Sequence, residues 1–561
     1  MSGRMDAFLF PFMAYVESVP MAGREPMSSV DRAWLMMDDP TNPMVINGFW
    51  IIKGRLQYEH VLAVLEERLL IHDRFRQRVV KHQGALRTRT YWQTDPEFDL
   101  REHVRRVVLP LPGDTETLND TVAQLLSDPL DLNRPLWTFT LIEGYEGGSV
   151  FFGRIHHCIG DGAALVRVLL ALTDESAEGA RPSPVAGAGP PLNRNTLRPP
   201  TGAAARPGSA ISRQGRKRAG QPAHLLSLAA RGGRLAGRFV AVLAKLALMT
   251  TDDKTAFKGE VGVGKAVAWS KGIPLDDVKF VKNTMEATVN DVLVAAMAGA
   301  LRRYVEARGD NPQGKEIRAM VPVDIRGPED TKLTNRFALV YLPLPIGIAD
   351  PFDRLLETKR HMDAIKRSPE ALVTYQAIAG LGVVSDRIAR SVRGYYASKV
   401  SVVLTNVPGP SQKLYFAGKL LDTIVFWVPQ SGSIGVGISI FSYAGQVNIG
   451  LITDRGLAPD PDTIVTAFQE EFDSFFLSGA RAGIAGASKR GARLTRRVRI
   501  QFGLAFVGNF GDAVNYAPNT WEDRPKTHVT LSRQSKCREM LTVTTIAPET
   551  TTIPSPATFS A

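Results

Sequence analysis

Cysteine is almost absent from this chain, with only Cys158 and Cys537 among its 561 residues. Two cysteines cannot build a disulfide framework or a cysteine-based zinc site, so neither kind of cross-link is expected. Such sparse cysteine usage is typical of a reducing compartment, and we expect a cytoplasmic protein. The sequence also lacks any run of roughly 18 uninterrupted apolar residues, the length that a transmembrane helix needs. Any membrane contact should therefore be peripheral.

The first twenty residues lack the long apolar stretch of a secretory signal. A short apolar run follows Arg4, but Asp6, Pro11 and Glu17 interrupt that run or close it early. We therefore predict no signal peptide. Residues 1–26 are expected to form a loose leader, with ordered structure beginning near Met27.

Charge of both signs is present, but basic residues dominate. The chain has 68 Lys and Arg against 56 Asp and Glu, a formal net charge of +12. A basic surface suits anionic partners, such as nucleic acid, acidic lipids or phosphate-bearing molecules like CoA, and it also occurs without any specific partner. Hydrophobic residues make up 44% of the chain, enough to build a sizeable core, and the length favours two domains.

Strand and helix patterns occur in two separate regions of the sequence. In the first region, alternating or apolar runs predict strands at residues 46–52, 138–142 and 149–155, and helical spacing predicts helices at 58–72 and 163–174. The second region predicts helices at 288–307 and 462–476, strands at 317–325, 337–346 and 401–408, and a hairpin over 435–454 that turns near Ala444 and Gly445.

These patterns predict two α/β domains, an N-terminal one over residues 27–175 and a C-terminal one over 265–480. Residues 176–264 join them, first as a linker rich in Ala, Gly, Pro, Ser and Arg, then as a basic amphipathic helix over 224–249. The tail, residues 481–561, is basic at first and then rich in Thr, Ser and Pro, and we expect most of it to be disordered.

Histidine is also scarce, with nine in the chain, yet two are adjacent in the segment HHCIGDG, residues 156–162. The pair ends an apolar strand and precedes a helix. Neighbouring side chains of a strand point to opposite faces, so one histidine can face a cavity while the other packs behind it. Gly160 and Gly162 permit a tight turn, and Asp161 can orient its surroundings.

Three interpretations of this motif are open from the residues alone. It can be a structural histidine pair, with Asp161 as the N-cap of the following helix. It can be a metal site, but His-His-x3-Asp differs from known zinc spacings and no nearby Cys or Glu completes a ligand set, so no metal is predicted. It can also supply a general base, since imidazole titrates near neutral pH.

The HHxxxDG pattern resembles the signature of the chloramphenicol acetyltransferase-like superfamily. Further segments, in matching order, resemble the bacterial wax ester synthase/diacylglycerol acyltransferase family: MSSVDRAWL (27–35), PMVI (43–46), RPLW (134–137), ND (290–291), VPVDIR (321–326), TNRF (334–337) and TNVPGP (405–410). The resemblance covers roughly residues 27–478. Thr334 departs from the pattern, because the family more often has Gly there, and the linker and tail are longer and more basic than the family needs.

The resemblance implies two chloramphenicol acetyltransferase-like α/β domains with mixed sheets and a tunnel between them. It implies direct transfer of a long-chain acyl group from acyl-CoA, a substrate rather than a cofactor, to diacylglycerol or a long-chain alcohol. His157 would act as the general base. Its strand neighbour Cys158 should point away from the site, and we interpret it as a buried apolar residue.

Other residues of the motifs are assigned supporting roles. His156 should pack or hydrogen-bond behind the base, and Gly162 should allow the turn. The superfamily resemblance implies an ion pair between Asp161 and an arginine, for which we predict Arg326. Pro135, Leu136 and Trp137 are expected to pack beneath the catalytic strand rather than to act on substrate.

Two interpretations are open for each of three polar residues, Asn290, Asp291 and Asn406. Asn290 and Asp291 lie at a helix start after Thr288 and can cap that helix, whereas the resemblance implies that the pair shapes an acyl or CoA channel. Asn406, in a rigid turn after a strand, can stabilise the oxyanion or merely end the strand. No oxyanion donor is assigned from the sequence.

The segment 224–249 is the predicted contact with a peripheral membrane or lipid-droplet surface, because its basic residues lie among apolar ones. An ordinary helix packed on the body fits equally. The basic clusters at 213–218 and 489–499 lack interleaved aromatics, so no nucleic-acid partner is predicted. Two other functions remain: acyl transfer to a different hydroxyl or amine, and a catalytically inactive lipid-surface binding protein.

Overall fold

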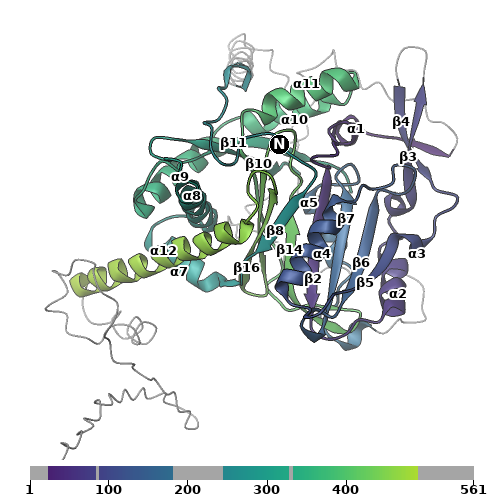
Figure 1. Ribbon diagram of the computed structural model, residues 1–561, viewed down its shortest axis with the longest axis horizontal. Helices are drawn as coiled ribbons and strands as arrows, with labels where there is room; N and C mark the ends of the chain where they lie inside the picture. The colour runs from purple at the N-terminus through teal and green to yellow at the C-terminus, as the bar shows by residue number, and fades with distance from the viewer. Residues whose placement is uncertain (1–22, 84–87, 181–243, 245, 327–332, 491–561) are drawn as a thin grey trace, which may run out of the picture. The chain divides into compact units, whose positions relative to one another are not determined.

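Two large mixed β-sheets, each covered by helices, form the framework that positions the histidine motif (Figure 1). The computed structural model describes residues 23–83, 88–180, 244, 246–326 and 333–490. The basic cluster at 213–218, most of the predicted helix at 224–249 and residues 491–561 of the predicted tail lie outside the described residues.

The first sheet carries the motif at the end of a central strand. Its strands follow the order β13 (Tyr415–Phe416), β14 (Lys419–Trp427), β2 (Val45–Ile52), β7 (Ser149–His156), β6 (Trp137–Glu143) and β5 (Val104–Val108). All neighbouring strands are antiparallel except β5 and β6. In the register of β2 and β7, Val45 is paired with His156.

Both faces of this sheet are buried, which explains why β7 has an apolar run instead of strict alternation. Phe152 belongs to the cluster that includes Leu118 and Val122 of α4 (Thr115–Ser127). Phe151 points to the other face and belongs to the cluster of α2 (Tyr58–Arg68) and α5 (Gly162–Leu170). The histidines that follow therefore emerge from a strand held on two sides.

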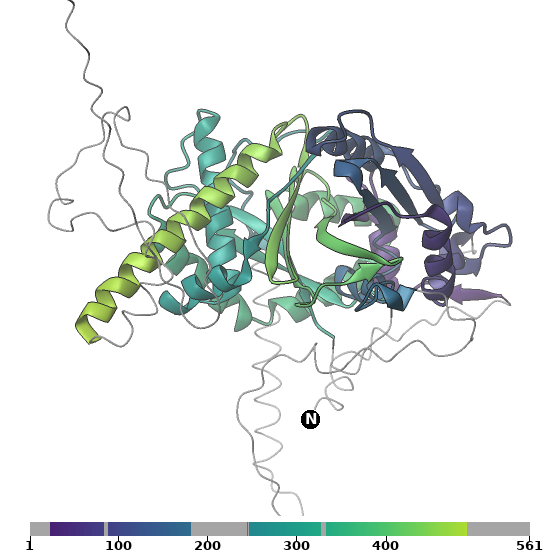
Figure 2. The same ribbon diagram turned by 90° about the horizontal axis from the view of Figure 1, so that it is seen from below.

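Strands β13 and β14 were not predicted, and they join the first sheet although they come from the second half of the chain. Residues 421–427 of β14 pair with β2, and Figure 2 shows this green segment reaching the purple and blue strands. Gly48 of β2 permits the close approach, because a Cβ there would lie 2.8 Å from the Cβ of Phe426. The two halves are thus joined by a shared sheet.

The second sheet contains all of the strands predicted after residue 300. Its order is β11 (Phe337–Leu344), β10 (Ile317–Asp324), β12 (Val402–Pro408), β15 (Val436–Tyr443), β16 (Gln446–Asp454) and β8 (Lys265–Trp269), and β9 (Ile273–Pro274) also pairs with β16. The predicted hairpin turn at Ala444 and Gly445 is confirmed. Both residues have positive φ, 48° and 78°, as a tight two-residue turn requires.

Helix α8 (Val289–Ala307) is the centre of the second core. It is buried almost all round, from Asp291 to Leu301, as expected of a helix enclosed by other elements. The cluster around it includes residues of α7 (Leu275–Thr284), α9 (Pro351–Lys366), α12 (Pro461–Arg490) and the strands. This core packs against the second sheet.

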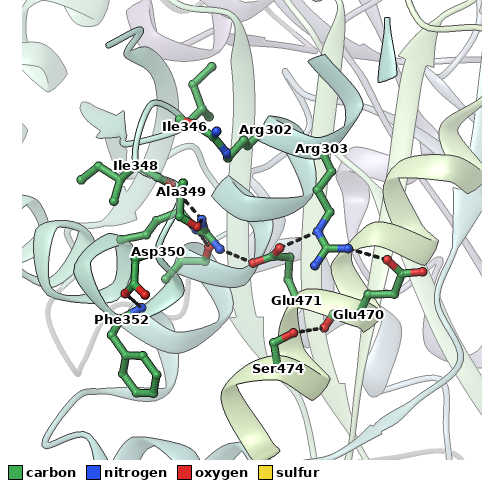
Figure 3. Close-up of polar contacts among 12 residues, drawn as sticks. Arg302, Arg303, Ile346, Ile348, Ala349, Asp350, Phe352, Glu470, Glu471 and Ser474 are labelled. Atoms are coloured by element: carbon green, nitrogen blue, oxygen red, sulfur yellow. Dashed lines mark hydrogen bonds and ion pairs between the residues drawn. The ribbon is translucent and has the colours of Figure 1, made fainter. Parts of the chain in front are cut away.

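A buried ion network fixes α12 to α8 and α9 (Figure 3). Glu471 accepts a 2.6 Å hydrogen bond from Nε of Arg303 and forms an ion pair with the fully buried Arg354. Burial lowers the pKa of Arg354, although Glu471 opposes this shift. Arg303 also reaches Glu470 at 2.7 Å. Removing one partner would leave an uncompensated buried charge, so this network stabilises the helix packing.

The remaining elements surround the first sheet and one edge of the second. A three-stranded sheet consists of β1 (Arg24–Pro26), β3 (Gln77–Gln83) and β4 (Thr88–Thr94). The helices are α1 (Ser29–Met36), α3 (Leu100–His103), α10 (Glu370–Leu381) and α11 (Asp386–Ala397). The 3-10 turns are η1 (Asp73–Arg76), η2 (Tyr145–Gly147) and η3 (Glu178–Ala180). Helix α1 contacts both α10 and α11.

The predicted fold class is confirmed, and the elements differ mainly at their ends. The helix predicted to reach Asp174 ends at Leu170, because Asp174 exchanges two 2.8 Å backbone hydrogen bonds with Tyr415 instead. The helix predicted over 58–72 ends at Arg68, before the turn that leads into η1. Residues 24–26 of the predicted loose leader form β1, and residues 1–22 of it lie outside the described residues. The last helix, predicted to end at Phe476, continues into the predicted tail as far as Arg490. The proposed domain limits stay a prediction.

Within the part of the chain that the structure describes, no helix is both long enough and apolar enough to span a membrane.

Candidate active site

The backbone of His157 is held where β7 ends. Its N–H donates to the carbonyl of Met44 at 2.7 Å, just beyond the last paired residue of β2. The side chains of His156 and His157 have different partners, as expected for neighbours at a strand end. His157 is the one that meets residues of the second half of the chain.

The imidazole of His157 lies between aromatic rings from two distant segments. Trp34 of α1 stacks on it at a centroid distance of 4.5 Å and an angle of 20°, and Phe337 of β11 lies 5.2 Å away. The residue is 7% exposed. Burial lowers the pKa of His157 to about 4, against the opposing influence of Asp161, so the ring is neutral at pH 7.

Asn335 determines which ring nitrogen of His157 carries the proton. Its Nδ2 donates to the backbone oxygen of His157 at 2.7 Å and to Oδ1 of Asp31 at 2.8 Å. Both of these partners are acceptors, so the amide must present Oδ1, not Nδ2, to the ring. Nδ1 of His157 therefore donates to that oxygen at 3.0 Å, and Nε2 keeps its lone pair.

Asp31 completes this chain of contacts from α1. It is buried, and burial raises its pKa, although hydrogen bonds to Asn335 and Ser28 act in the opposite direction. In the sequence, the segments MSSVDRAWL and TNRF indicate only a family resemblance. The structure shows that Asp31, Trp34, Asn335 and Phe337 of these two segments surround the histidine, a role that the residue types alone did not indicate.

Asp161 has both of its expected structural roles, the N-cap predicted from the residues and the ion pair implied by the resemblance. As N-cap of α5, it accepts a hydrogen bond from the amide of Ala164 at 2.9 Å. Its other oxygen forms an ion pair with Arg326 and accepts from the amide of Arg336 at 2.8 Å. The Asp161 and Arg326 side chains are 4% and 3% exposed. The predicted pair is present and ties the motif to the segment between β10 and β11.

His156 points away from His157 and is fully buried. Its Nδ1 accepts from the amide of Cys158 at 3.1 Å, and its Nε2 lies 3.6 Å from Oδ1 of Asp38. Burial opposes ionisation of Asp38, but His156 and the amide of Met44 outweigh it and lower the pKa of Asp38. The described contacts of His156 therefore support the strand end.

Cys158 is 1% exposed, and burial raises the pKa of its thiol well above the usual range. The thiolate is the nucleophilic form of cysteine, so this residue is not activated for attack.

The two glycines of the motif have a different explanation from the one predicted. Neither has a positive φ, so the turn itself does not require glycine. A Cβ at Gly160 would lie 2.7 Å from Cδ1 of Leu333, so Gly160 permits a close approach. A Cβ at Gly162 would meet no heavy atom within 4 Å, which leaves open space at the first turn of α5.

Pro135, Leu136 and Trp137 pack beneath the motif, as predicted. All three are buried, and the carbonyl of Leu136 accepts from the amide of His156 at 2.9 Å. Nε1 of Trp137 donates to the carbonyl of Phe75 at 2.8 Å.

Asn290, Asp291 and Asn406 lie where α8 begins and β12 ends. Asp291 forms a capping box with Thr288, which bears out the capping interpretation for this residue. Oδ1 of Asn290 accepts from Nδ2 of Asn406 at 2.7 Å, a contact that the sequence did not predict. Among the described contacts of these residues, none is with His157.

A small cavity of about 20 Å³ lies between the two halves, near the motif. Its lining comes from both sheets and the intervening segments: Asn42, Pro43, Val45, Asn47, Leu126, Arg154, Lys265, Pro429, Gln430 and Ile452. His157 does not line it, so the predicted tunnel past His157 stays a prediction. In the described ranges, no three His, Cys, Asp or Glu residues are grouped as metal ligands.

The family profiles and the sequence relatives agree on one family. The profile of the wax ester synthase/diacylglycerol acyltransferase catalytic domain matches residues 27–293, and that of the C-terminal domain of the same family matches residues 333–475. A Mycobacterium tuberculosis protein named as a diacylglycerol O-acyltransferase is 29% identical over 472 residues, 80% of this chain and 89% of the relative. The O-acyltransferase WSD of Acinetobacter baylyi is 28% identical over 402 residues, 69% and 83% of the two chains.

Solved structures support the fold. The wax ester synthase/diacylglycerol acyltransferase from Marinobacter aquaeolei VT8 aligns with a TM-score of 0.57 at 22% identity, covering 81% of this chain and 99% of that one. The first condensation domain of the calcium-dependent antibiotic synthetase aligns with a TM-score of 0.51 at 15% identity, covering 82% and 96%. The chain belongs to the wax ester synthase/diacylglycerol acyltransferase family, and it is an acyltransferase.

Proposed function

We propose that this protein transfers a long-chain acyl group from acyl-CoA to the hydroxyl of diacylglycerol or of a long-chain alcohol, with His157 as the general base. The observation that carries this proposal is the contact of Nδ1 of His157 with Oδ1 of Asn335 at 3.0 Å. The Nδ1–H of the ring is bound to Asn335 and the pKa of the ring lies at about 4, so a neutral Nε2 is available at pH 7. A base must be unprotonated before it can accept a proton.

In the proposed reaction, Nε2 of His157 takes the proton of the acceptor hydroxyl as its oxygen attacks the thioester carbonyl. The tetrahedral intermediate then breaks its carbon–sulfur bond, and the imidazolium returns the proton to the leaving CoA thiolate. The products are an ester and free CoA. Because the thiol of Cys158 is buried with a raised pKa, the acyl group passes directly to the acceptor without an acyl-enzyme.

Two sets of contacts position the base in this proposal. Asn335, itself bound to Asp31, fixes the ring orientation and the tautomer that leaves Nε2 free. The pair of Asp161 and Arg326 fixes the segment that follows the histidine. Acyl-CoA is a substrate here, and the proton transfer assigned to His157 requires no cofactor.

The aromatic surroundings of His157 suit a reaction that must exclude water. Hydrolysis of the thioester competes with transfer, and Trp34 and Phe337 cover the ring with apolar surface. The same surface accommodates an acyl chain or a lipid acceptor better than a polar one. This favours a lipid alcohol over an amine or another polar acceptor.

The acceptor is tested directly with purified protein. Labelled palmitoyl-CoA is incubated with hexadecanol, with diacylglycerol, or with both, and products are separated by thin-layer chromatography. We expect labelled wax ester, triacylglycerol or both, with release of one CoA per ester. Label in free fatty acid alone, or in neither ester, would refute the assignment of a lipid alcohol as acceptor.

A further inference from the structure

Large hydrophobic side chains are exposed around α10 and α11. Leu372 of α10 and Val383 just after it are 46% and 53% exposed. Leu372 lies in the first turn of α10, and Val383 lies in the turn that follows the helix. Ile388 and Tyr395 of α11 are 52% and 42% exposed, and seven residues separate them, so they share a face of α11.

A fifth exposed residue lies beside α11. Leu248 is 82% exposed, and the hydroxyl of Tyr395 donates to the carbonyl of its neighbour Ala247. Leu246 is buried against Ala397 of α11 and Val373 of α10. Residues 246–248 close the segment that the sequence singled out as apolar and basic, so the end of that segment meets the same surface.

Basic residues accompany this apolar surface. Between Lys366 and Val400 the chain has six Lys or Arg and two acidic residues, and one of the acidic residues, Glu370, is fully buried. Arg387 and Arg390 of α11 are exposed, and among the described residues neither has an ion-pair partner. They are free to meet anionic groups of another surface. Leu248, Leu372, Val383, Ile388 and Tyr395, with Arg387 and Arg390, are called the α10–α11 face below.

The α10–α11 face is coupled to the active site through α1. Nη1 of Arg32 donates to the carbonyl of Gly382 at 2.5 Å, where α10 joins α11. Arg393 of α11 donates to the carbonyl of Met37 at 2.7 Å and pairs with Asp39 at 2.9 Å. Ile378 of α10 belongs to the same buried cluster as Trp34, the residue stacked on His157. One helix layer therefore lies between this face and the proposed base.

We propose that the α10–α11 face docks on an anionic lipid bilayer, which holds the lipid acceptor next to the site. Apolar side chains enter the interface, while arginines bind acidic headgroups, the combination typical of peripheral lipid contacts. This proposal rests on the proposed function, because its acceptors, diacylglycerol and long-chain alcohols, reside in lipid. The docking itself is tested separately from the chemistry.

The test uses the full chain and vesicles of two compositions, phosphatidylcholine alone and phosphatidylcholine with phosphatidylglycerol, in a flotation assay. The charge variant combines Arg387→Glu with Arg390→Glu, and the apolar variant combines Leu372→Ser with Ile388→Ser. We expect the charge variant to bind anionic vesicles at least about tenfold more weakly, since each basic residue near the surface contributes about 1 kcal/mol. The apolar variant should bind both vesicle types more weakly.

Matched controls change the same residue types elsewhere. Val108 and Leu111 are 71% and 93% exposed, so Val108→Ser with Leu111→Ser controls for apolar area. Lys81→Glu with Lys271→Glu controls for charge, because both lysines are exposed outside this face. These controls should bind vesicles as the wild type does. If the face variants bind as well as the wild type, or the controls lose binding equally, the docking proposal is overturned.

Activity separates docking from chemistry. The face variants should lose transfer to diacylglycerol in anionic vesicles about in proportion to binding, while transfer to a short water-soluble alcohol stays within about twofold of the wild type. A wild type that binds vesicles through this face but makes no ester would overturn the proposed function and leave docking supported. Equal loss with the short alcohol would show damage to the site and overturn docking.

Discussion

The pKa of His157 makes the most specific prediction, because a buried neutral base should remain active in mild acid. The fraction of neutral imidazole at pH 5.5 is about 97% for a pKa of about 4, and about 9% for an ordinary pKa of 6.5. kcat/KM reports ionisation in the free enzyme. We therefore expect kcat/KM at pH 5.5 to equal its value at pH 7.5 within experimental error, with the acid limb centred well below pH 6.

The same shift makes folding depend on pH. The folded state keeps His157 neutral, so between pH 6.5 and about 4 the unfolded state binds more protons, and stability falls as the pH falls. The lowering of the pKa from 6.5 to about 4 corresponds to about 3 kcal/mol of folding stability, and this amount is fully lost only below pH 4. Above pH 6.5 the ring is neutral in both the folded and the unfolded state, so His157 causes no loss of stability there.

The assay measures initial rates of CoA release at limiting acyl-CoA from pH 4.5 to 8.5, with a thermal midpoint at each pH to exclude unfolding. His157→Gln serves as the stability control, because glutamine does not titrate and should flatten the dependence of the midpoint between pH 6.5 and 4.5. An acid limb of kcat/KM centred near pH 6.5 in protein that remains folded would refute the reasoning, since it would mean that the ring is solvated.

Three further substitutions test the surroundings of the base. Asn335→Ala removes the acceptor of Nδ1–H and should lower kcat at least about tenfold with little change in KM, measured by steady-state kinetics; an equal kcat would exclude a positioning role. Asp161→Asn leaves the buried Arg326 with only the more exposed Asp324 as an ion-pair partner, and should lower the free energy of unfolding by about 2–3 kcal/mol in urea; a loss below about 1 kcal/mol would contradict the pair's importance. Cys158→Ala should retain kcat within about threefold, because the thiol is not activated; complete loss would indicate an acyl-enzyme.

Local patterns in the sequence were sufficient to predict the elements that carry the motif. The apolar run of β7 and the turn at Ala444 and Gly445 depend on neighbouring residues only, so they could be predicted directly. β14 could not be predicted as part of the first sheet, because its pairing with β2 joins residues more than 360 positions apart. No periodicity in either segment specifies such a partner.

In the site, too, residues close together in the sequence could be predicted, whereas residues brought together by the fold could not. His156, His157 and Asp161 lie within six consecutive residues, and their spacing alone pointed to them. The pairing of Asp161 with Arg326 followed from a family resemblance and not from residue patterns. Asn335, Trp34 and Asp31 reach the ring only because α1 and the start of β11 fold onto the end of β7.

The central claim, that His157 is the base of a direct acyl transfer, is tested most directly by the rate of ester formation in His157→Ala. The variant and the wild type are compared with palmitoyl-CoA and the preferred lipid alcohol, after thermal unfolding shows that both are folded. We expect kcat to fall at least about a hundredfold, the contribution typical of a general base. Ester formation within about threefold of the wild type would contradict the account.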